Sequence, residues 1–311
     1  MAQEMGFLLA NGVYYVEEMV KRGVDVDEFA PKISFFCAQT HHIFEEVAKY
    51  RASRRLWARI LKERFGAKKP SSMYMRLTAM MCPIEYQREQ PELNLVRGAY
   101  AALAGALAGC QGMLNPAFDE VFDIPSEKGH RLALGTCEIL AHETNVRKTV
   151  DPLGGSYYIE ALTNQVEQAL IQRMKEVEDR GGPIPALESG WEQGEGYKTM
   201  IKYIEGVESG EIPYVGRNIY VSEEPEEVEL SLHHPDPETA QKQIAQLKKI
   251  KGERDNAKVS HCLDQLRQAA RGTENLMPYL IEAAEAYTSL GEITETLKGE
   301  WGEYKEPIIN L

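Results

Sequence analysis

The sequence predicts an α/β fold with a short parallel β-sheet, followed by a mostly helical region. Three short apolar segments, residues 32–38, 74–81 and 110–114, have the character of buried strands. The segments between them place apolar residues at helical spacing, so that strands recur at intervals of roughly 35 residues. This alternation is typical of βα units, in which consecutive strands run parallel. A sheet of three such strands has two open edges and needs cover on both faces.

Each expected helix carries its own signal. Gly23 ends the first helical pattern, and Ser126 is a candidate N-cap with Glu127 in the first turn behind it. Gly154 and Gly155 allow a tight turn, after which Ser156 can cap a further helix. The patterns predict helices over residues 2–22, 43–65, 93–107, 126–144 and 161–179.

Beyond residue 180 the character of the sequence changes. Residues 180–196 are rich in glycine and proline and predict turns. Residues 215–239 read as an extended acidic connection, and residues 240–272 and 276–299 as two charged helices.

The charge balance limits the classes of partner. The chain has 311 residues with 35 Lys and Arg against 48 Asp and Glu, a formal charge of -13. An acidic balance argues against a nucleic acid or an anionic membrane as the main partner. No apolar run approaches the roughly 20 residues of a transmembrane helix.

Cysteine usage indicates the compartment. The five cysteines are scattered and show no metal-like spacing, which favours a reducing, cytoplasmic location. The first residues lack a basic segment and carry early acidic residues, so we expect no signal peptide.

Two pairs of basic residues are candidate site residues with simpler alternatives. His41 and His42 follow the first strand, but no third metal ligand lies near them in sequence, which favours surface or helix-entry histidines. Lys68 and Lys69 lie in a loop and suit either a solvated turn or a phosphate contact.

The loop after the third strand is the strongest candidate from spacing alone. It carries Gln111, Asp119 and Glu120, and α/β barrels place ligand groups after their strands. The two carboxylates could equally compensate a helix dipole. Arg76 lies on an apolar strand and needs either a ligand anion or a structural carboxylate as its partner.

Several segments, in order along the chain, resemble the catalytic subunits of adenosylcobalamin-dependent acyl-CoA mutases, the methylmalonyl-CoA mutase family. The segments PKISFF, QPELNLVRGAY, CQGMLNPAFDE and VDPLGGSYYIEALT are similar to the family's P-R-L-S-F-F, Q-x-P-x-N-N-x-V-R, T-Q-S-L-H-T-N-x-x-D-E and D-P-x-G-G-S-Y-x-x-E-x-L-T. The segment FEEVAKYRASRRLWARILKERFGAKKP and the stretch from VGRNIY to GEITETLKGEWGEYK also fit. The resemblance covers essentially the whole chain.

The resemblance implies the carboxyl-terminal part of a (β/α)₈ barrel through which an acyl-CoA threads. Adenosylcobalamin lies over the carboxyl ends of the strands, and its radical chemistry drives a 1,2 rearrangement of the carbon skeleton, while the protein positions the reactants and excludes water. By position, we expect substrate or CoA contacts from Lys32, Ser34, Lys68, Lys69, Arg76, Thr78 and Gln111, and cofactor contacts from Met80, Asn115 and Glu120.

Three departures from the family pattern affect what the resemblance implies. The family's S-G-Y-H-x-x-E-A-G-A segment, which holds a catalytic histidine, would precede this chain, as would the first five strands, so we expect no catalytic residue here. Thr78 and Met80 replace the histidine and glutamine of the family's R-x-H-x-Q-T strand, and Lys32 replaces an arginine. Pro116 takes the place of the loop asparagine, although Asn115 is adjacent, and the cobalamin-binding signature D-x-H-x-x-G does not occur.

These observations predict a two-part chain with two alternative functions. Residues 1–165 would form strands 6–8 of the barrel with their helices, and residues 166–311 the helical and extended region behind it. The first hypothesis is a mutase subunit, inactive alone, that needs an N-terminal half-barrel chain and a cobalamin-binding subunit with which it shares adenosylcobalamin. The alternative is a non-catalytic, mutase-derived scaffold that binds a partner without turnover.

Overall fold

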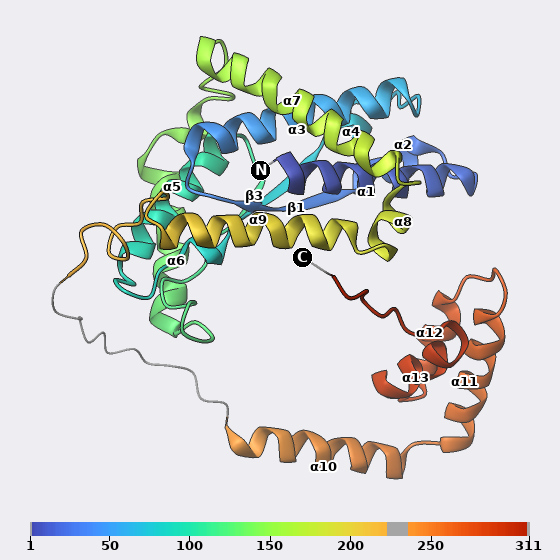
Figure 1. Ribbon diagram of the computed structural model, residues 1–311. Helices are drawn as coiled ribbons and strands as arrows, with labels where there is room; N and C mark the ends of the chain where they lie inside the picture. The colour runs from blue at the N-terminus through green and yellow to red at the C-terminus, as the bar shows by residue number, and fades with distance from the viewer. Residues whose placement is uncertain (1, 223–235, 310–311) are drawn as a thin grey trace. The chain divides into compact units, whose positions relative to one another are not determined.

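The computed structural model describes residues 2–222 and 236–309, which belong to two compact units (Figure 1). The first unit comprises Met1–His233 and Pro307–Leu311, and the second comprises His234–Glu306. Each unit buries an apolar cluster of its own. Residues 223–235 of the expected acidic connection over 215–239 lie outside the described residues.

The first unit is organised around a parallel sheet in the order β1-β2-β3. The strands are β1 (Ser34–Gln39), β2 (Arg76–Met81) and β3 (Gly112–Leu114), which confirms the three expected strands and their direction. β1 begins two residues later than expected because Ala30–Lys32 forms the 3-10 helix η1, with Pro31 in its first turn.

Three helices, α1 (Ala2–Lys21), α3 (Ile43–Glu63) and α5 (Leu93–Leu107), cover one face of the sheet. Trp57 of α3 packs edge-on against Phe35 of β1, with ring centroids 4.9 Å apart. Gly12 of α1 faces the same ring, where an added Cβ would lie 3.0 Å from it. α7 (Tyr157–Glu178) forms a second layer over α1 and α3. The expected helices over 2–22, 43–65 and 93–107 are therefore confirmed.

The first unit also contains α6 and several helices of three or four residues. The Ser126 hydroxyl accepts a 3.0 Å hydrogen bond from Gly129 N–H, which confirms it as the cap of α6. These elements are α2 (Val26–Phe29), α4 (Pro70–Met73), η2 (Pro83–Glu85), α6 (Glu127–Glu143) and η3 (Val146–Lys148).

The Gly154–Gly155 turn ties the second helical layer to the first. α7 begins four residues earlier than expected, and Ser156 sits at its N-cap without a capping hydrogen bond from its side chain. Glu160 instead accepts from Gly155 N–H at 2.8 Å and from Arg51 of α3 at 2.7 Å, and Arg51 also pairs with Asp151 at 2.9 Å. The turn therefore holds α3 and α7 together through these hydrogen bonds and ion pairs.

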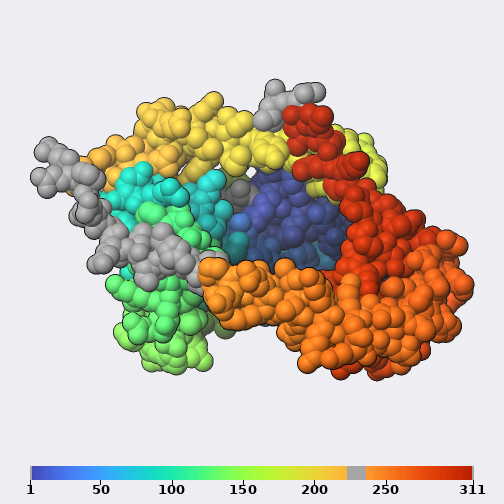
Figure 2. Space-filling model, turned by 90° about the horizontal axis from the view of Figure 1, so that it is seen from below, coloured from blue at the N-terminus to red at the C-terminus, as the bar shows by residue number. Residues whose placement is uncertain are grey.

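The expectation of turns over residues 180–196 is wrong. This stretch contains α8 (Pro183–Glu188) and the start of α9 (Trp191–Glu208). Packing overrides the poor helix propensity of the glycines, because Trp191 contacts Phe7 of α1 and the Thr199 hydroxyl donates to Gln3. α9 consequently runs beside α1, as the space-filling view also shows (Figure 2).

Residues 236–306, the described part of the second unit, contain four helices where two were expected. Asp255 splits the first pattern by capping a new helix at Ala257 and Lys258, and Ser289 splits the second through a capping box with Glu292. The helices are α10 (Pro237–Glu253), α11 (Asn256–Ala270), α12 (Met277–Glu285) and α13 (Leu290–Trp301).

Two further expectations concern the chain as a whole. The expected domain boundary at residue 165 stays a prediction, although that position falls inside α7, which packs on α1 and α3 of the same unit. Among the described helices, none combines the length and the apolarity that a membrane crossing requires.

Candidate functional site

The uncovered face of the sheet gathers several of the expected site residues. Alternation places one set of side chains on this open face, and the strand register aligns Ser34 with Arg76, Phe36 with Thr78 and Ala38 with Met80. The intervening residues, among them Phe35, Cys37, Leu77 and Ala79, are buried beneath the helices. The open face consists of Ser34, Phe36, Ala38, Arg76, Thr78, Met80, Gly112 and Leu114.

The open face is unusually exposed for a sheet interior. Phe36 is 53% exposed and Leu114 is 47% exposed, whereas Phe35 is 5% exposed. A Cβ on Gly112 would lie only 2.7 Å from Thr78 Oγ1, so the glycine leaves room for that side chain. Exposed large apolar side chains on a sheet face indicate a surface that binds a ligand or another protein chain.

The amino-terminal end of this sheet is basic. Lys32 lies two residues before β1, at the end of η1. The backbone N–H groups of Lys68 and Lys69 donate to the Asp27 carboxylate at about 3.1 Å, which holds their loop beside α2. The nearby Ser72 hydroxyl and, to a smaller extent, these backbone N–H groups lower the pKa of Asp27. All three lysine side chains are exposed, so the structure brings them to one end of the sheet, where an anionic group could contact them.

Arg76 and Gln111 lie at the same end with different surroundings. Arg76 is exposed and forms no ion pair with any described residue, so no structural carboxylate is its partner there, and its expected contact with a ligand anion stays a prediction. The Gln111 side chain accepts from Leu77 N–H at 2.7 Å and donates to Gly109 O at 2.8 Å, which extends the pairing of β2 with β3. Gln111 therefore has a structural role, and its expected contact with substrate stays a prediction.

The carboxyl-terminal end carries Asn115 and Glu120. The Tyr86 hydroxyl lies 3.4 Å from Asn115 Oδ1 and 3.1 Å from Pro116 O, and burial, with a smaller contribution from Glu120, raises the pKa of Tyr86. A Cβ on Gly98 would lie 2.6 Å from Asn115 Oδ1, so α5 approaches this loop closely. The Glu120 carboxylate is half-buried and has no hydrogen-bond or ion-pair partner among the described residues.

Comparison with known proteins identifies the family. The model of the methylmalonyl-CoA mutase family matches residues 1–303. The chain belongs to the methylmalonyl-CoA mutase family. It is 43% identical over 309 residues to the 2-hydroxyisobutanoyl-CoA mutase large subunit of Aquincola tertiaricarbonis, covering 98% of this chain and 54% of the relative. It is 36% identical to the methylmalonyl-CoA mutase of Rhizobium meliloti and 35% identical to the mitochondrial enzyme of Mus musculus, covering 43% and 40% of those proteins.

The chain therefore spans about half the length, or less, of the curated relatives it matches. In this member of the mutase family, the sheet of three parallel strands is consistent with the carboxyl-terminal part of a barrel. The exposed side of its strands is then the side that a complete barrel would turn inwards.

Asp119, the other carboxylate of the loop after β3, is structural in this mutase-family chain. It is buried and accepts from Ser126 N–H at 3.2 Å and from the Ser126 hydroxyl at 2.5 Å, so it supports the cap of α6. Of the two acids that spacing left open, Asp119 thus fits the helix-dipole alternative and Glu120 keeps the ligand alternative.

Sequence reasoning missed a cavity of about 520 Å³ at the carboxyl ends of β1 and β2. Lys49, whose side chain is 1% exposed, pairs there with Glu46 at 2.6 Å and donates to Ala38 O at 2.7 Å. Burial raises the pKa of Glu46 despite this pairing. The cavity is lined by Ala38, Thr40 and Cys82 near the strand ends and by Thr199, Met200 and Tyr203 of α9.

The two histidines behave differently from each other. His42 is an exposed residue at the start of α3, as the sequence favoured. His41 Nδ1 lies 2.7 Å from the buried Glu85 carboxylate, which also accepts from His41 N–H at 3.1 Å. The described residues contain no cluster able to hold a metal ion. Glu85 follows the neighbouring strand at the same sheet end, and that topology is the signal by which the pairing could have been found.

Proposed function

We propose that this chain forms the carboxyl-terminal part of the catalytic barrel of an adenosylcobalamin-dependent acyl-CoA mutase, an isomerase that rearranges the carbon skeleton of an acyl-CoA. It would act together with an N-terminal half-barrel and a cobalamin-binding subunit or domain. The observation that carries this proposal is the open face, where Ser34, Arg76, Thr78 and Met80 lie together on an uncovered sheet. One relative is named a large subunit, which supports a multi-chain assembly.

The charge distribution along the sheet suits an acyl-CoA that lies along the open face. The basic amino-terminal end, with Lys32, Lys68, Lys69 and Arg76, suits the phosphate groups of coenzyme A. The acyl group would then extend along the open face towards Thr78 and Met80. Because the basic residues lie at one end of the strands and the apolar residues lie along them, the acyl-CoA would bind in one direction only.

The loop after β3 fits the adenosyl part of the cofactor. Glu120 offers an unpartnered carboxylate at the carboxyl-terminal end, which suits a pair of ribose hydroxyls, and Asn115 lies in the same loop. Adenosylcobalamin would supply the radical chemistry of the rearrangement. The residues of this chain would orient the reactants and exclude water from the open face.

Thr78 and Met80 bear on the substrate. Compared with the histidine and glutamine of the family pattern, these two side chains give the open face fewer hydrogen-bonding groups and more apolar surface. This difference favours an acyl group other than methylmalonyl. The same two residues are the specific observation in favour of the alternative, a mutase-derived scaffold without turnover.

Co-purification from the native source tests the proposal. We expect the tagged chain to bring down a half-barrel chain and a cobalamin-binding chain, and the complex to isomerise an acyl-CoA with added adenosylcobalamin. The chain alone should show no turnover. A stable complex that binds both ligands without converting any acyl-CoA would instead support the scaffold.

Substitution of Glu120 tests the cofactor role within that complex. Loss of a carboxylate that binds ribose hydroxyls costs about 1.5–3 kcal/mol, so Glu120→Ala should weaken the response to adenosylcobalamin by about tenfold to a hundredfold and leave CoA binding unchanged. Asp123→Ala, which removes an exposed carboxylate three residues away, is the matched control. An unchanged cofactor response in Glu120→Ala would refute the role.

A further inference from the structure

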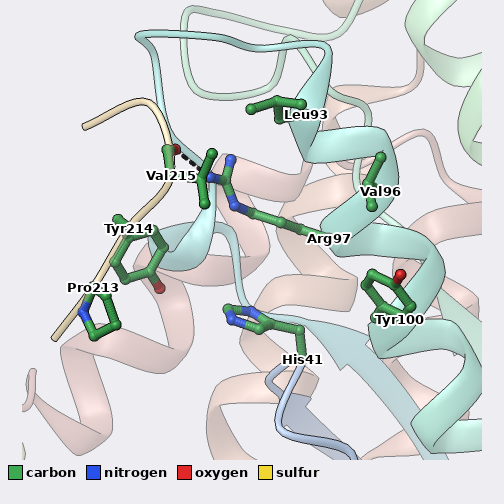
Figure 3. A pocket seen from close by; sticks show the side chains of 8 residues that line it. All are labelled: His41, Leu93, Val96, Arg97, Tyr100, Pro213, Tyr214 and Val215. Carbon is green, nitrogen blue, oxygen red and sulfur yellow. Dashed lines mark hydrogen bonds between the residues drawn. The ribbon is translucent and has the colours of Figure 1, made fainter. Parts of the chain in front are cut away.

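A second cavity lies away from the open face, between α5 and residues 213–215. Its volume is about 250 Å³, smaller than the cavities that hold drug-sized ligands. Figure 3 shows Arg97 reaching across it from α5 and the His41 ring on its other side. The lining consists of His41, Leu93, Val96, Arg97, Tyr100, Pro213, Tyr214 and Val215.

Arg97 is a half-buried cation with no carboxylate in ion-pair contact among the described residues. It donates to Asn94 Oδ1 and to Val215 O, each at 2.8 Å, and lies over the Tyr214 ring at 5.6 Å. It forms no ion pair with a described carboxylate, and its other guanidinium N–H groups have no acceptor among the described residues. Burial lowers the pKa of this guanidinium, although the Glu89 and Glu85 carboxylates act on it in the opposite direction without forming an ion pair with it.

His41 is held so that one nitrogen remains for a ligand. Its Nδ1 is engaged by Glu85, and its ring meets Tyr214 edge-on at 6.2 Å, so the ring is fixed on two sides. Nε2 has no hydrogen-bond partner among the described residues. A second polar group therefore faces the cavity opposite Arg97 (Figure 3).

We propose that this cavity binds a small carboxylate with an apolar tail. The guanidinium can hold a carboxylate through two parallel hydrogen bonds, and the protonated His41 ring can donate to the same group from Nε2 while Nδ1 donates to Glu85. Leu93, Val96 and Pro213 would surround the tail. Inorganic phosphate suits the cavity less well, because most of its lining offers no hydrogen-bond donor. Every lining residue belongs to the first unit of this chain, so the site does not depend on the proposed mutase assembly.

Calorimetric titration of the full chain with benzoate tests the proposal. Benzamide is the neutral probe of the same shape, acetate lacks the tail, and phosphate lacks both the tail and the carboxylate. We expect benzoate to bind at one site at least tenfold more tightly than each of the other three. Equal binding of benzamide, or tighter binding of phosphate, would overturn the assigned ligand class.

Variants locate the site. Arg97→Gln should weaken benzoate binding at least tenfold and His41→Gln by threefold or more, while His42→Gln, the neighbouring exposed histidine, should leave it within twofold. Arg97 also holds Asn94 and Val215, so Val96→Trp, which fills the cavity from an exposed position, provides a second test in a chain whose fold is checked by its melting temperature. Unchanged benzoate binding in folded Val96→Trp would overturn the proposal.

Discussion

The two faces of the same three strands differ sharply in their surroundings. Phe35 and Cys37 point to a face covered by α1, α3 and α5, whereas Phe36, which lies between them, is half exposed on the open face. The strand backbone is the same for both faces, so the difference lies in what covers them. The covered face is completed by this chain, and the open face retains the residues that the family resemblance assigns to ligands.

The backbone groups along the free edge of β1 also differ from one another in whether this chain supplies their hydrogen-bond partners. Ala38 N–H donates to Glu4 at 2.7 Å, and Ala38 O accepts from Lys49 at 2.7 Å, so the carboxyl end of this edge is closed by side chains. By the alternation of a parallel ladder, Ser34 and Phe36 turn their backbone groups to the same edge. An additional strand could therefore pair at Ser34 and Phe36, and pairing would stop at Ala38.

Thiol labelling should give the largest contrast between the faces. Burial raises the pKa of Cys37 to about 12, while an exposed cysteine has a pKa of about 8.5. Ser34→Cys should therefore react with iodoacetamide at pH 8 at least about 1,000-fold faster than Cys37, and its rate should rise between pH 7 and 9 as its thiolate forms. Peptide mass spectrometry reads both sites in one sample, and comparable rates would contradict the difference between the faces.

Adjacent phenylalanines provide the next contrast. Phe35→Ala removes a ring packed against Trp57 and should lower the free energy of unfolding by about 3–5 kcal/mol. Phe36→Ala should change it by no more than about 0.5 kcal/mol in the chain alone. Chemical denaturation measures both variants. A large loss in Phe36→Ala would mean that the open face is packed within this chain.

Substitution of Gln111 should have a smaller effect on the free energy of unfolding, because its side chain supports the pairing of β2 with β3. Gln111→Ala leaves Leu77 N–H without its acceptor and should cost about 1–2 kcal/mol of stability. Thr78→Val, on the open face of the same strand, should be close to neutral and serves as the control. If Gln111→Ala left the free energy of unfolding unchanged, the structural role of this side chain would be wrong.

The sheet and its helices could be predicted because their signals are local. Apolar alternation and helical spacing identified β1, β2, α1, α3 and α5. α9 was missed because Gly194 and Gly196 lower its helix propensity, and its stability depends on Trp191 packing against α1. The break before α13 was predictable, since Ser289 and Glu292 form a capping box.

The candidate site was less accessible to sequence reasoning. Its residues were assigned through the resemblance, and their grouping on one face follows from the period of two along each strand. The pairing of His41 with Glu85 joins residues 44 positions apart, and the cavity at Arg97 is closed by residues 213–215, which are more distant still. Neither leaves a local pattern in the chain.

Residue-resolved amide exchange in β1 tests most directly the claim that this sheet has an open face and a free edge for the rest of a barrel. In the monomeric chain, we expect Phe36 N–H to exchange at least about 100-fold faster than Cys37 N–H, because Cys37 bonds to β2 and Phe36 faces the edge. Addition of the complementary half-barrel should slow Phe36 to the rate of Cys37. Equal, strong protection of both amides in the monomer would contradict the account and indicate a self-contained fold.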